Sequence, residues 1–230
     1  GTVTVAQTKI AALGHTAGKA KVILKATATK AGKKVSSCTI CGTAVKTTAI
    51  KAAKVSLSKR AYPYTGEVIK TKKLPKVVVK TAAGKTIPAK YYTVTKPKNV
   101  KKMKDIGRYT YTVKFKSTCP EYKGTVKLHL EIKPAKITIN APKAAKKAIT
   151  VKWKKGKKAQ VTGYQVMVAT DKKFTKNVKK TFVKGYSKTS YMMTKLKAKK
   201  KYFVKVRAYK TVKGVKIYSD WSKVKTVKTK

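Results

Sequence analysis

Apolar side chains occupy every second position along most of this chain, and that spacing constrains the fold more than any other feature. Residues 109–115 read YTYTVKF, with an aromatic ring or valine at each odd-numbered position. The same rhythm recurs in VKLHLEI at 126–132, ITVKW at 149–153 and YFVKVRA at 202–208. Successive side chains of a β-strand point to opposite faces of the sheet, so each stretch predicts a strand with one buried face. We therefore predict an all-β protein built from tandem β-sandwich domains.

The length of the chain and two breaks in its apolar pattern predict three modules. The apolar rhythm stops near residues 50–54 and again at 132–136, where Pro134 interrupts a strand pattern. We expect a small β-rich spacer module carrying a C-x-x-C pair at 1–51 and β-sandwiches at 52–133 and 134–230. The first module, with strands expected at Thr2 to Val5 and Val22 to Leu24, is too small to bury much apolar surface alone.

The last module carries residues typical of a known domain family. Strand-like ITVKW at 149–153, GYQV at 163–166 and YSDWS at 218–222 follow one another at the spacing of short antiparallel strands. This pattern resembles the fibronectin type III domain. The resemblance implies a Trp in the core on the second strand and a Tyr on the sixth strand that ties a corner near a Leu. The implied structural core residues are Trp153, Tyr164, Leu196 and Tyr202.

The first two modules resemble parts of another group of proteins. YPYTG at 62–66, YYTV at 91–94 and YKGT at 122–125 are similar to motifs of the immunoglobulin-like repeats in large Gram-positive surface proteins. The stretch from His15 to Gly42 resembles a short repeat found between domains of the same proteins. Together the three modules resemble a multidomain surface protein with an immunoglobulin-like repeat followed by a lysine-rich fibronectin type III domain.

Positive charge dominates the composition. Sixty Lys and Arg residues stand against six Asp and Glu, which gives a formal net charge of +54. A surface charged with one sign repels itself unless it meets a polyanion. Only Arg60, Arg108 and Arg207 are arginines. Because Lys is a solvated point charge and lacks the planar fork of Arg, the excess favours diffuse attraction to anionic polymers over the reading of a nucleic-acid sequence.

Seven basic residues of the last module are predicted to make this contact with an anionic polymer. They flank the second, sixth and seventh expected strands, where lysine also protects sheet edges from aggregation. Acidic residues would protect edges equally well, so the one-sided choice favours a polyanion partner. The predicted polyanion-binding residues are Lys152, Lys154, Lys155, Lys205, Arg207, Lys213 and Lys216.

The pair Cys38 and Cys41 is the main chemical motif. A zinc site would need two further ligands, and His15 is the sole local candidate. A redox role of the thioredoxin type needs a βαβ context. We therefore predict a local disulfide or two structural thiols, and no metal site.

Catalytic patterns are missing from the sequence. The six acidic residues are scattered, so no carboxylate pair for glycoside hydrolysis is evident. His129 and Glu131 share one strand face, which we interpret as a surface cluster. No phosphate-binding glycine loop, G-x-S-x-G or H-E-x-x-H motif occurs. We predict no enzyme activity, no cofactor and no catalytic residue.

Three functions remain open from the sequence. The first is an extracellular, cell-wall-associated spacer held to anionic polymers such as a teichoic acid-like wall polymer or a sulfated glycan. The second is an adhesin that binds a host protein or glycan. The third is nonspecific binding of nucleic acid, which a pI of about 10.4 permits. No apolar stretch approaches the roughly 18 residues of a membrane span.

Overall fold

The protein is all-β and consists of β-sandwich domains in tandem, as expected from the spacing of its apolar residues. A computed structural model describes residues 14–98 and 100–230. The expected strand at Thr2 to Val5 lies outside these residues. Three single-turn 3-10 helices are the helical elements of the described part: η1 (Thr71–Lys73), η2 (Ala89–Tyr91) and η3 (Val100–Lys102). No helix in these two ranges is both long enough and apolar enough to span a bilayer.

Two compact units share the described residues. The first contains the described residues up to Ser56 together with Val77–Thr95 and Thr112–Lys127. The second contains Leu57–Lys76, Lys96–Tyr111 and Leu128–Lys230. The module boundaries predicted above stay predictions.

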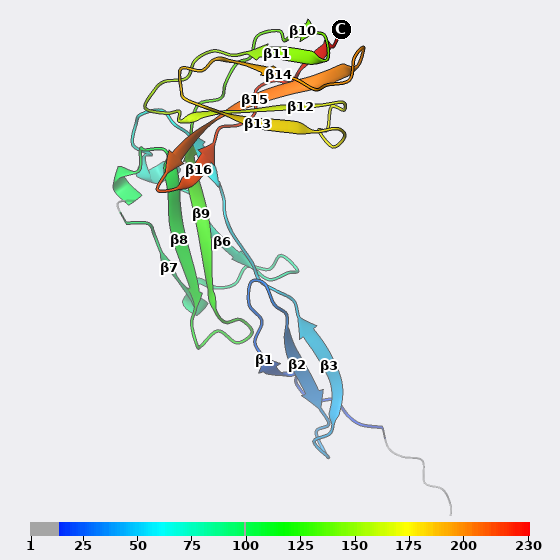
Figure 1. Cartoon of the computed structure of the whole chain (residues 1–230). Coiled ribbons are helices and arrows are strands. Elements are labelled where there is room, and N and C mark those ends of the chain that lie inside the picture. Colours follow the sequence, from blue (N-terminus) through cyan, green and yellow to red (C-terminus); the bar gives the residue numbers. More distant parts are fainter. Residues whose placement is uncertain (1–13, 99) are drawn as a thin grey trace, which may run out of the picture. The chain divides into compact units, whose positions relative to one another are not determined.

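The first sheet has the antiparallel order β1-β2-β3, formed by β1 (Lys21–Leu24), β2 (Gly32–Ser37) and β3 (Ala44–Ile50) (Figure 1). Most of its side chains face solvent, and six of the seven residues of β3 are exposed. Gly32 is the first residue of β2, and only glycine fits there without a shift of the backbone, because a Cβ would meet the Leu24 carbonyl oxygen at 2.2 Å. The sheet buries very little apolar surface of its own.

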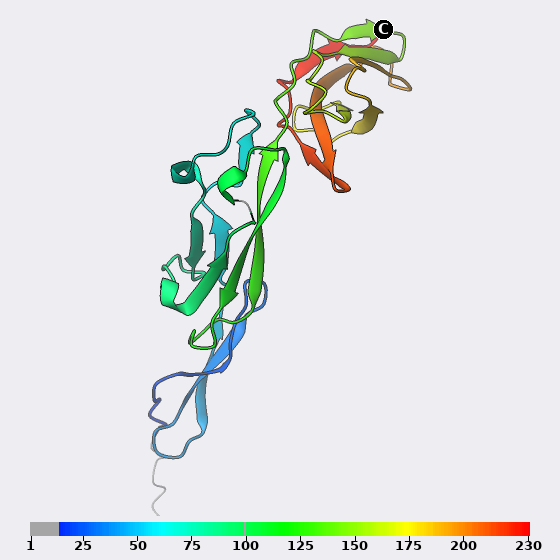
Figure 2. The same ribbon diagram turned by 90° about the vertical axis from the view of Figure 1, so that its left-hand side faces the viewer.

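The middle of the chain forms a two-stranded and a four-stranded sheet. Strands β4 (Lys54–Leu57) and β6 (Val77–Lys80) pair with each other. The larger sheet has the order β5-β9-β8-β7, and Figure 2 shows β8 and β9 as neighbouring long strands. Its members are β5 (Ala61–Pro63), β7 (Tyr92–Thr95), β8 (Gly107–Phe115) and β9 (Thr125–Lys133).

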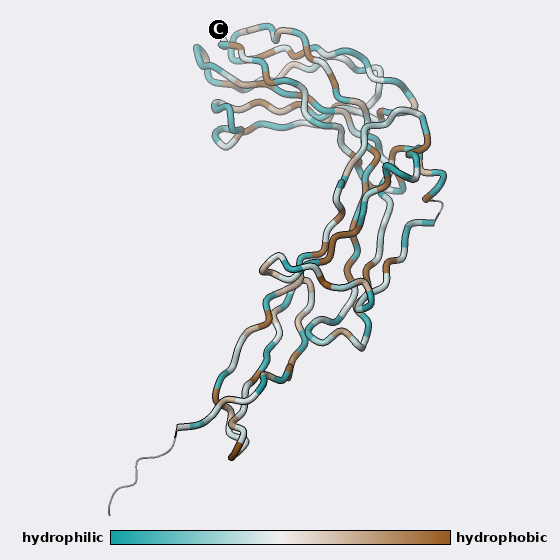
Figure 3. Tube along the Cα trace, turned by 180° about the vertical axis from the view of Figure 1, so that it is seen from behind, coloured by the Kyte–Doolittle hydropathy of each residue, from teal (hydrophilic) through white to brown (hydrophobic). Residues whose placement is uncertain are grey.

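Burial along β8 and β9 follows the predicted alternation. Tyr111, Val113 and Phe115 are buried, whereas Lys114 between them is exposed. On β9, Leu130 and Ile132 are buried and His129 is exposed. Figure 3 shows hydrophobic and hydrophilic residues interspersed along the chain.

The last domain is a sandwich of two antiparallel sheets. One has the order β10-β11-β14, from β10 (Lys143–Ala145), β11 (Ala148–Lys152) and β14 (Ser190–Met193). The other has the order β13-β12-β15-β16, and β17 pairs with β15. Its strands are β12 (Gly163–Ala169), β13 (Lys179–Lys184), β15 (Lys201–Val212), β16 (Val215–Tyr218) and β17 (Lys225–Lys228). The inward residues of both sheets form one hydrophobic core.

Several tight turns of this domain place lysine where the backbone is left-handed. Lys147, Lys195, Lys199 and Lys213 have φ values of 50°, 55°, 49° and 48°. Glycine adopts this region without strain, and Asn tolerates it better than most residues. All four lysines are exposed.

Candidate functional site

Carboxylates neutralise few of the cations. Across the described ranges three ion pairs form: Lys34 with Glu121 at 3.7 Å, Arg108 with Glu131 at 2.8 Å, and Lys133 with Asp220 at 3.2 Å. The Asp171 carboxylate is used locally, because it accepts the backbone N–H groups of Lys173, Thr175 and Lys176 in its own turn. Most lysine ammonium groups are therefore left to solvent and to any external anion.

The seven predicted polyanion-binding residues do not form one patch. Lys152, at the end of β11, and the following Lys154 and Lys155 are exposed beside the sheet β10-β11-β14. The other four belong to the opposite sheet of the sandwich. Among them Lys213 and Lys216 are exposed, at the β15–β16 turn and on β16. A contact with polymer would have to use several faces of the domain.

Lys205 and Arg207 have a different role, because both are half-buried among aromatic rings on the outer face of β15. The Lys205 ammonium lies 3.7 Å from the ring centre of Phe174 and 4.7 Å from that of Trp221. The Arg207 guanidinium lies 4.3 Å from the Trp221 ring and 3.8 Å from the Tyr218 ring. Cations and rings thus alternate in a stack that we call the cation–aromatic ladder.

Burial affects the charges of this ladder. Desolvation, with a smaller effect of the neighbouring Arg207 charge, lowers the pKa of Lys205. Desolvation likewise lowers the pKa of Arg207, which remains cationic. Arg207 Nε also donates a hydrogen bond of 2.8 Å to Gln165 Oε1 on the neighbouring β12. These two cations are engaged within the domain and offer less to an external anion than Lys152, Lys154 or Lys155.

Two serines fix the segment that supplies Trp221. The Ser219 hydroxyl accepts the Ala208 N–H at 3.0 Å, and the Ser222 hydroxyl accepts the Val206 N–H at 3.0 Å. Both N–H groups belong to β15, so the YSDWS segment is held to the strand by its serine side chains. This segment carries part of the family resemblance in the sequence, but the ladder was not predicted from it. A partial signal was present, because the cations Lys205 and Arg207 share one face of a strand, but the rings between them come from distant positions of the sequence.

The four residues implied as structural core are all buried. The rings of Trp153 and Tyr164 pack with centroids 5.1 Å apart. The Tyr202 hydroxyl accepts the N–H of Lys197 at 3.0 Å, next to the buried Leu196. The tyrosine corner therefore forms with lysine-rich sequence at 197–201.

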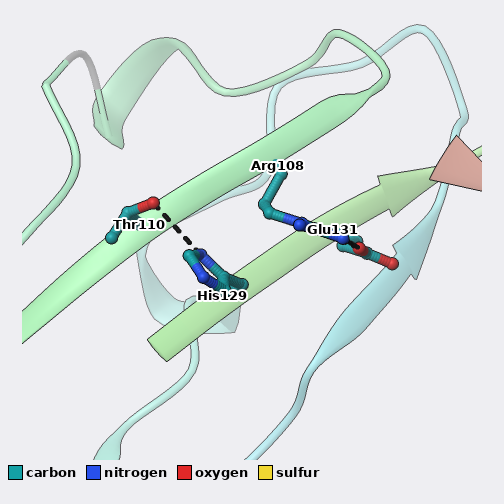
Figure 4. Close-up of polar contacts among 4 residues, drawn as sticks. All are labelled: Arg108, Thr110, His129 and Glu131. Atoms are coloured by element: carbon teal, nitrogen blue, oxygen red, sulfur yellow. Dashed lines mark hydrogen bonds and ion pairs between the residues drawn. The ribbon is translucent and has the colours of Figure 1, made fainter. Parts of the chain in front are cut away.

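A second polar cluster spans β8 and β9 (Figure 4). Arg108 donates through Nε and Nη2 to Glu131 Oε1, at 3.1 and 2.8 Å. One pair further along, Thr110 Oγ1 and His129 Nδ1 lie 3.1 Å apart. Both are exposed cross-strand pairs of the kind that stabilise neighbouring strands. Neither brings a nucleophile to a cleft.

Within residues 14–98 and 100–230, the group of side chains that could hold a metal lies at the first sheet. His15, Cys38 and Cys41 place one ligand atom each within 4.8 Å of one another. All three cysteines carry free thiols in this structure, and the predicted Cys38–Cys41 disulfide stays a prediction. The backbone N–H of Cys41, then that of Ile40, then the His15 side chain lower the pKa of Cys38 to about 6. Cys38 is buried, whereas Cys41 and His15 are exposed.

Comparison with family models identifies the last domain. Residues 132–225 match the fibronectin type III domain, which confirms that part of the resemblance drawn from the sequence. No curated protein matches the chain.

Solved structures also match parts of the chain at low identity. One, described as a myokine, is 20% identical, with 40% of this chain and 90% of that chain covered and a TM-score of 0.31. Domains FN1–FN3 of chicken CNTN1 are 15% identical over 94% of this chain and 68% of that one, with a TM-score of 0.36. A beta-1,2-glucanase from Parabacteroides distasonis is 16% identical over 57% of this chain, which spans 18% of the glucanase, with a TM-score of 0.33.

Proposed function

We propose that this protein, whose residues 132–225 form a fibronectin type III domain, is a non-catalytic segment of an extracellular surface protein. Its β-sandwiches serve as spacers, and its lysines attach it to anionic polymers of the cell wall. The partner class is a polyanion with repeating charge, such as a teichoic acid-like polyphosphate or a sulfated glycan. The recognition is electrostatic and independent of polymer sequence.

The observation that carries this proposal is the nearly unopposed positive charge of the chain. A formal net charge of +54 with three ion pairs in the described part leaves most ammonium groups without an internal partner. Each lysine close to an anionic surface contributes on the order of 1 kcal/mol. Several weak contacts acting together retain a protein without any deep pocket.

The position of the lysines supports a distributed mode of binding. Alternation along the strands sends apolar side chains inward and lysines outward, so exposed cations lie on both sheets of the last domain. A long flexible polymer can follow such a surface, whereas a compact anionic ligand would need one focused patch. Lysine also suits this role because its solvated ammonium is indifferent to the geometry of the anionic group.

Retention on isolated cell wall tests the proposal. The protein should bind native wall material at low salt and should be released as salt rises, because ions screen the attraction and compete for the polymer. Wall material stripped of its anionic polymer should retain little. Equal retention on stripped and native wall would overturn the electrostatic mechanism.

Parallel columns of heparin, DNA and mucin separate the alternatives. Similar salt-dependent retention on heparin and DNA is expected from a nonspecific polycation. Salt-resistant retention on mucin alone would instead indicate an adhesin with a specific ligand.

A further inference from the structure

Three side chains with strong affinity for soft metal ions meet at one end of the first sheet. His15 comes from the segment before β1, and Cys38 and Cys41 come from the turn between β2 and β3. The Cys41 Sγ lies 3.3 Å from His15 Nδ1. The three ligand atoms lie within 4.8 Å of one another.

Backbone hydrogen bonds build this arrangement. The segment after His15 pairs with the end of β2, because Gly18 N–H donates to Ser37 O at 2.9 Å and Thr39 N–H donates to Thr16 O at 3.0 Å. Ala17 and Cys38 form an antiparallel bridge at the same place. His15 is therefore positioned by strand-type pairing, next to the cysteine turn.

The cysteine turn is itself a tight structure. Cys38 N–H donates to Thr43 O at 2.8 Å, and Gly42 N–H donates to Cys38 O at 3.1 Å. Gly42 has φ of +74°, a conformation that glycine adopts without strain. The turn directs the Ile40 N–H at Cys38 Sγ, 3.5 Å away, an arrangement that suits a negatively charged sulfur.

The spacing of these atoms agrees with a tetrahedral metal centre. With Zn–S of about 2.3 Å and Zn–N of about 2.0 Å, two ligands at a tetrahedral angle lie about 3.5 Å apart. The observed Sγ–Nδ1 distance of 3.3 Å is close to that value. The other two separations are at most 4.8 Å, against about 3.8 Å for two sulfurs on one tetrahedral zinc, so shifts of up to about 1 Å would bring all three atoms onto one ion.

We propose that His15 Nδ1, Cys38 Sγ and Cys41 Sγ bind one Zn²⁺ per chain, with the fourth position held by water or an external ligand. Two thiolates and an imidazole select zinc-type ions over Ca²⁺ and Mg²⁺, which take oxygen ligands. Both thiols lose their protons to solvent on binding, so the two sulfur charges balance the ion and no electron is transferred.

The poor core of the first sheet supplies a physical reason for such a site. Strand β1 has no fully buried residue, and β3 buries only Ile50. Small domains with little core are commonly stabilised by a metal or a disulfide. A zinc ion would join the segment before β1 to the β2–β3 turn, at the end where apolar contacts are fewest.

Cobalt substitution tests the site directly in the full chain. The reduced, metal-free protein, with three titratable thiols verified, is titrated with Co²⁺ without oxygen, and the visible spectrum is recorded. We expect tetrahedral d–d bands and thiolate-to-cobalt charge transfer, saturating at one ion per chain and displaced by Zn²⁺. A featureless or octahedral spectrum would overturn the proposal.

Single substitutions test which side chains bind the metal ion. Cys38→Ser, Cys41→Ser and His15→Asn should each weaken zinc binding by at least about 100-fold, since even outer-shell partners are worth about 10- to 100-fold. Cys119→Ala is the matched control, because it removes the remaining thiol and should leave the cobalt spectrum unchanged. Loss of the spectrum in Cys119→Ala, or its persistence in His15→Asn, would contradict the assignment.

Hydrogen exchange distinguishes a built site from adventitious binding by thiols. Zinc should increase amide protection at residues 15–19 and 37–43 in the wild type and not in Cys38→Ser. The fibronectin type III domain should exchange equally with and without zinc. Zinc binding that leaves both segments unchanged would mean that these residues do not form the proposed centre.

Discussion

Two cationic side chains of the last domain, Lys205 and Arg207, are packed against aromatic rings on the surface. Lys205 and Arg207 occupy outward positions of β15, where a solvated lysine would be expected from the alternation. They instead lie between Phe174, Trp221 and Tyr218. Cation–aromatic contacts contribute about 0.5 to 2 kcal/mol each, depending on desolvation. The chain thus uses rings to accommodate charges that it cannot pair with carboxylates.

Asp171 leads to a prediction about how folding stability depends on pH. The N–H of Lys176, followed by smaller contributions from Thr175 and Lys173, holds the pKa of Asp171 below its ordinary value. A carboxylate with a lowered pKa in the folded state stabilises the fold above the unfolded pKa, and that stabilisation is lost as pH falls through the folded pKa. Asp171→Ala should therefore be less stable than wild type at pH 7, with a difference that shrinks below roughly pH 4.

Urea unfolding of both proteins between pH 2 and pH 7 measures this difference. Asp220→Ala is the control, since its carboxylate is exposed and contacts only Lys133. A stability difference for Asp171→Ala that stays constant down to pH 2 would show that the carboxylate charge is not involved.

The burial of each strand decides whether the sequence could predict it. Alternation predicted β8, β9, β11 and β15, because one buried face per strand leaves a period of two. The β1–β3 sheet gave a weaker signal, since most of its side chains face solvent on both sides. His15 could not be joined to Cys38 from the sequence, because their proximity depends on backbone pairing between residues 16–18 and 37–39.

The tyrosine corner supports a prediction at the level of the element. Tyr202 on β15 ties the preceding loop by accepting the Lys197 N–H, and its ring is buried. Tyr202→Phe should lower the free energy of unfolding by about 1 to 3 kcal/mol, because a partly buried N–H loses its acceptor. Denaturant unfolding followed by tryptophan fluorescence provides the measurement.

Tyr191→Phe on β14 is the matched control, since it removes a hydroxyl from a half-buried tyrosine packed on the same core. We expect a change below about 0.5 kcal/mol for this variant, as for most substitutions away from such features. Equal losses in the two variants would mean that the corner hydrogen bond contributes nothing specific.

At the level of the whole molecule, the distribution of charge decides between diffuse and focused binding. Lys152, Lys154 and Lys155 can be neutralised together by substitution with Gln, and so can the exposed Lys72, Lys73 and Lys76 elsewhere in the chain. If attachment is diffuse, each triple variant should reduce the slope of log K against log salt by about 2 to 3, close to one per lysine.

Heparin binding at several salt concentrations measures both slopes. Similar reductions in the two variants support distributed attachment. Complete loss of binding in one triple variant, with no change in the other, would indicate a single anion site and would contradict the proposed mode of binding.

Backbone strain and surface charge are connected at four lysines with a left-handed backbone: Lys147, Lys195, Lys199 and Lys213. An L-residue with a side chain adopts such a backbone at a cost of roughly 1 kcal/mol compared with glycine. Three connections, β10–β11, β14–β15 and β15–β16, accept that strain at four exposed lysines. Glycine at any of these positions would relieve the strain and would also remove one cation from the surface that we propose binds anionic polymers.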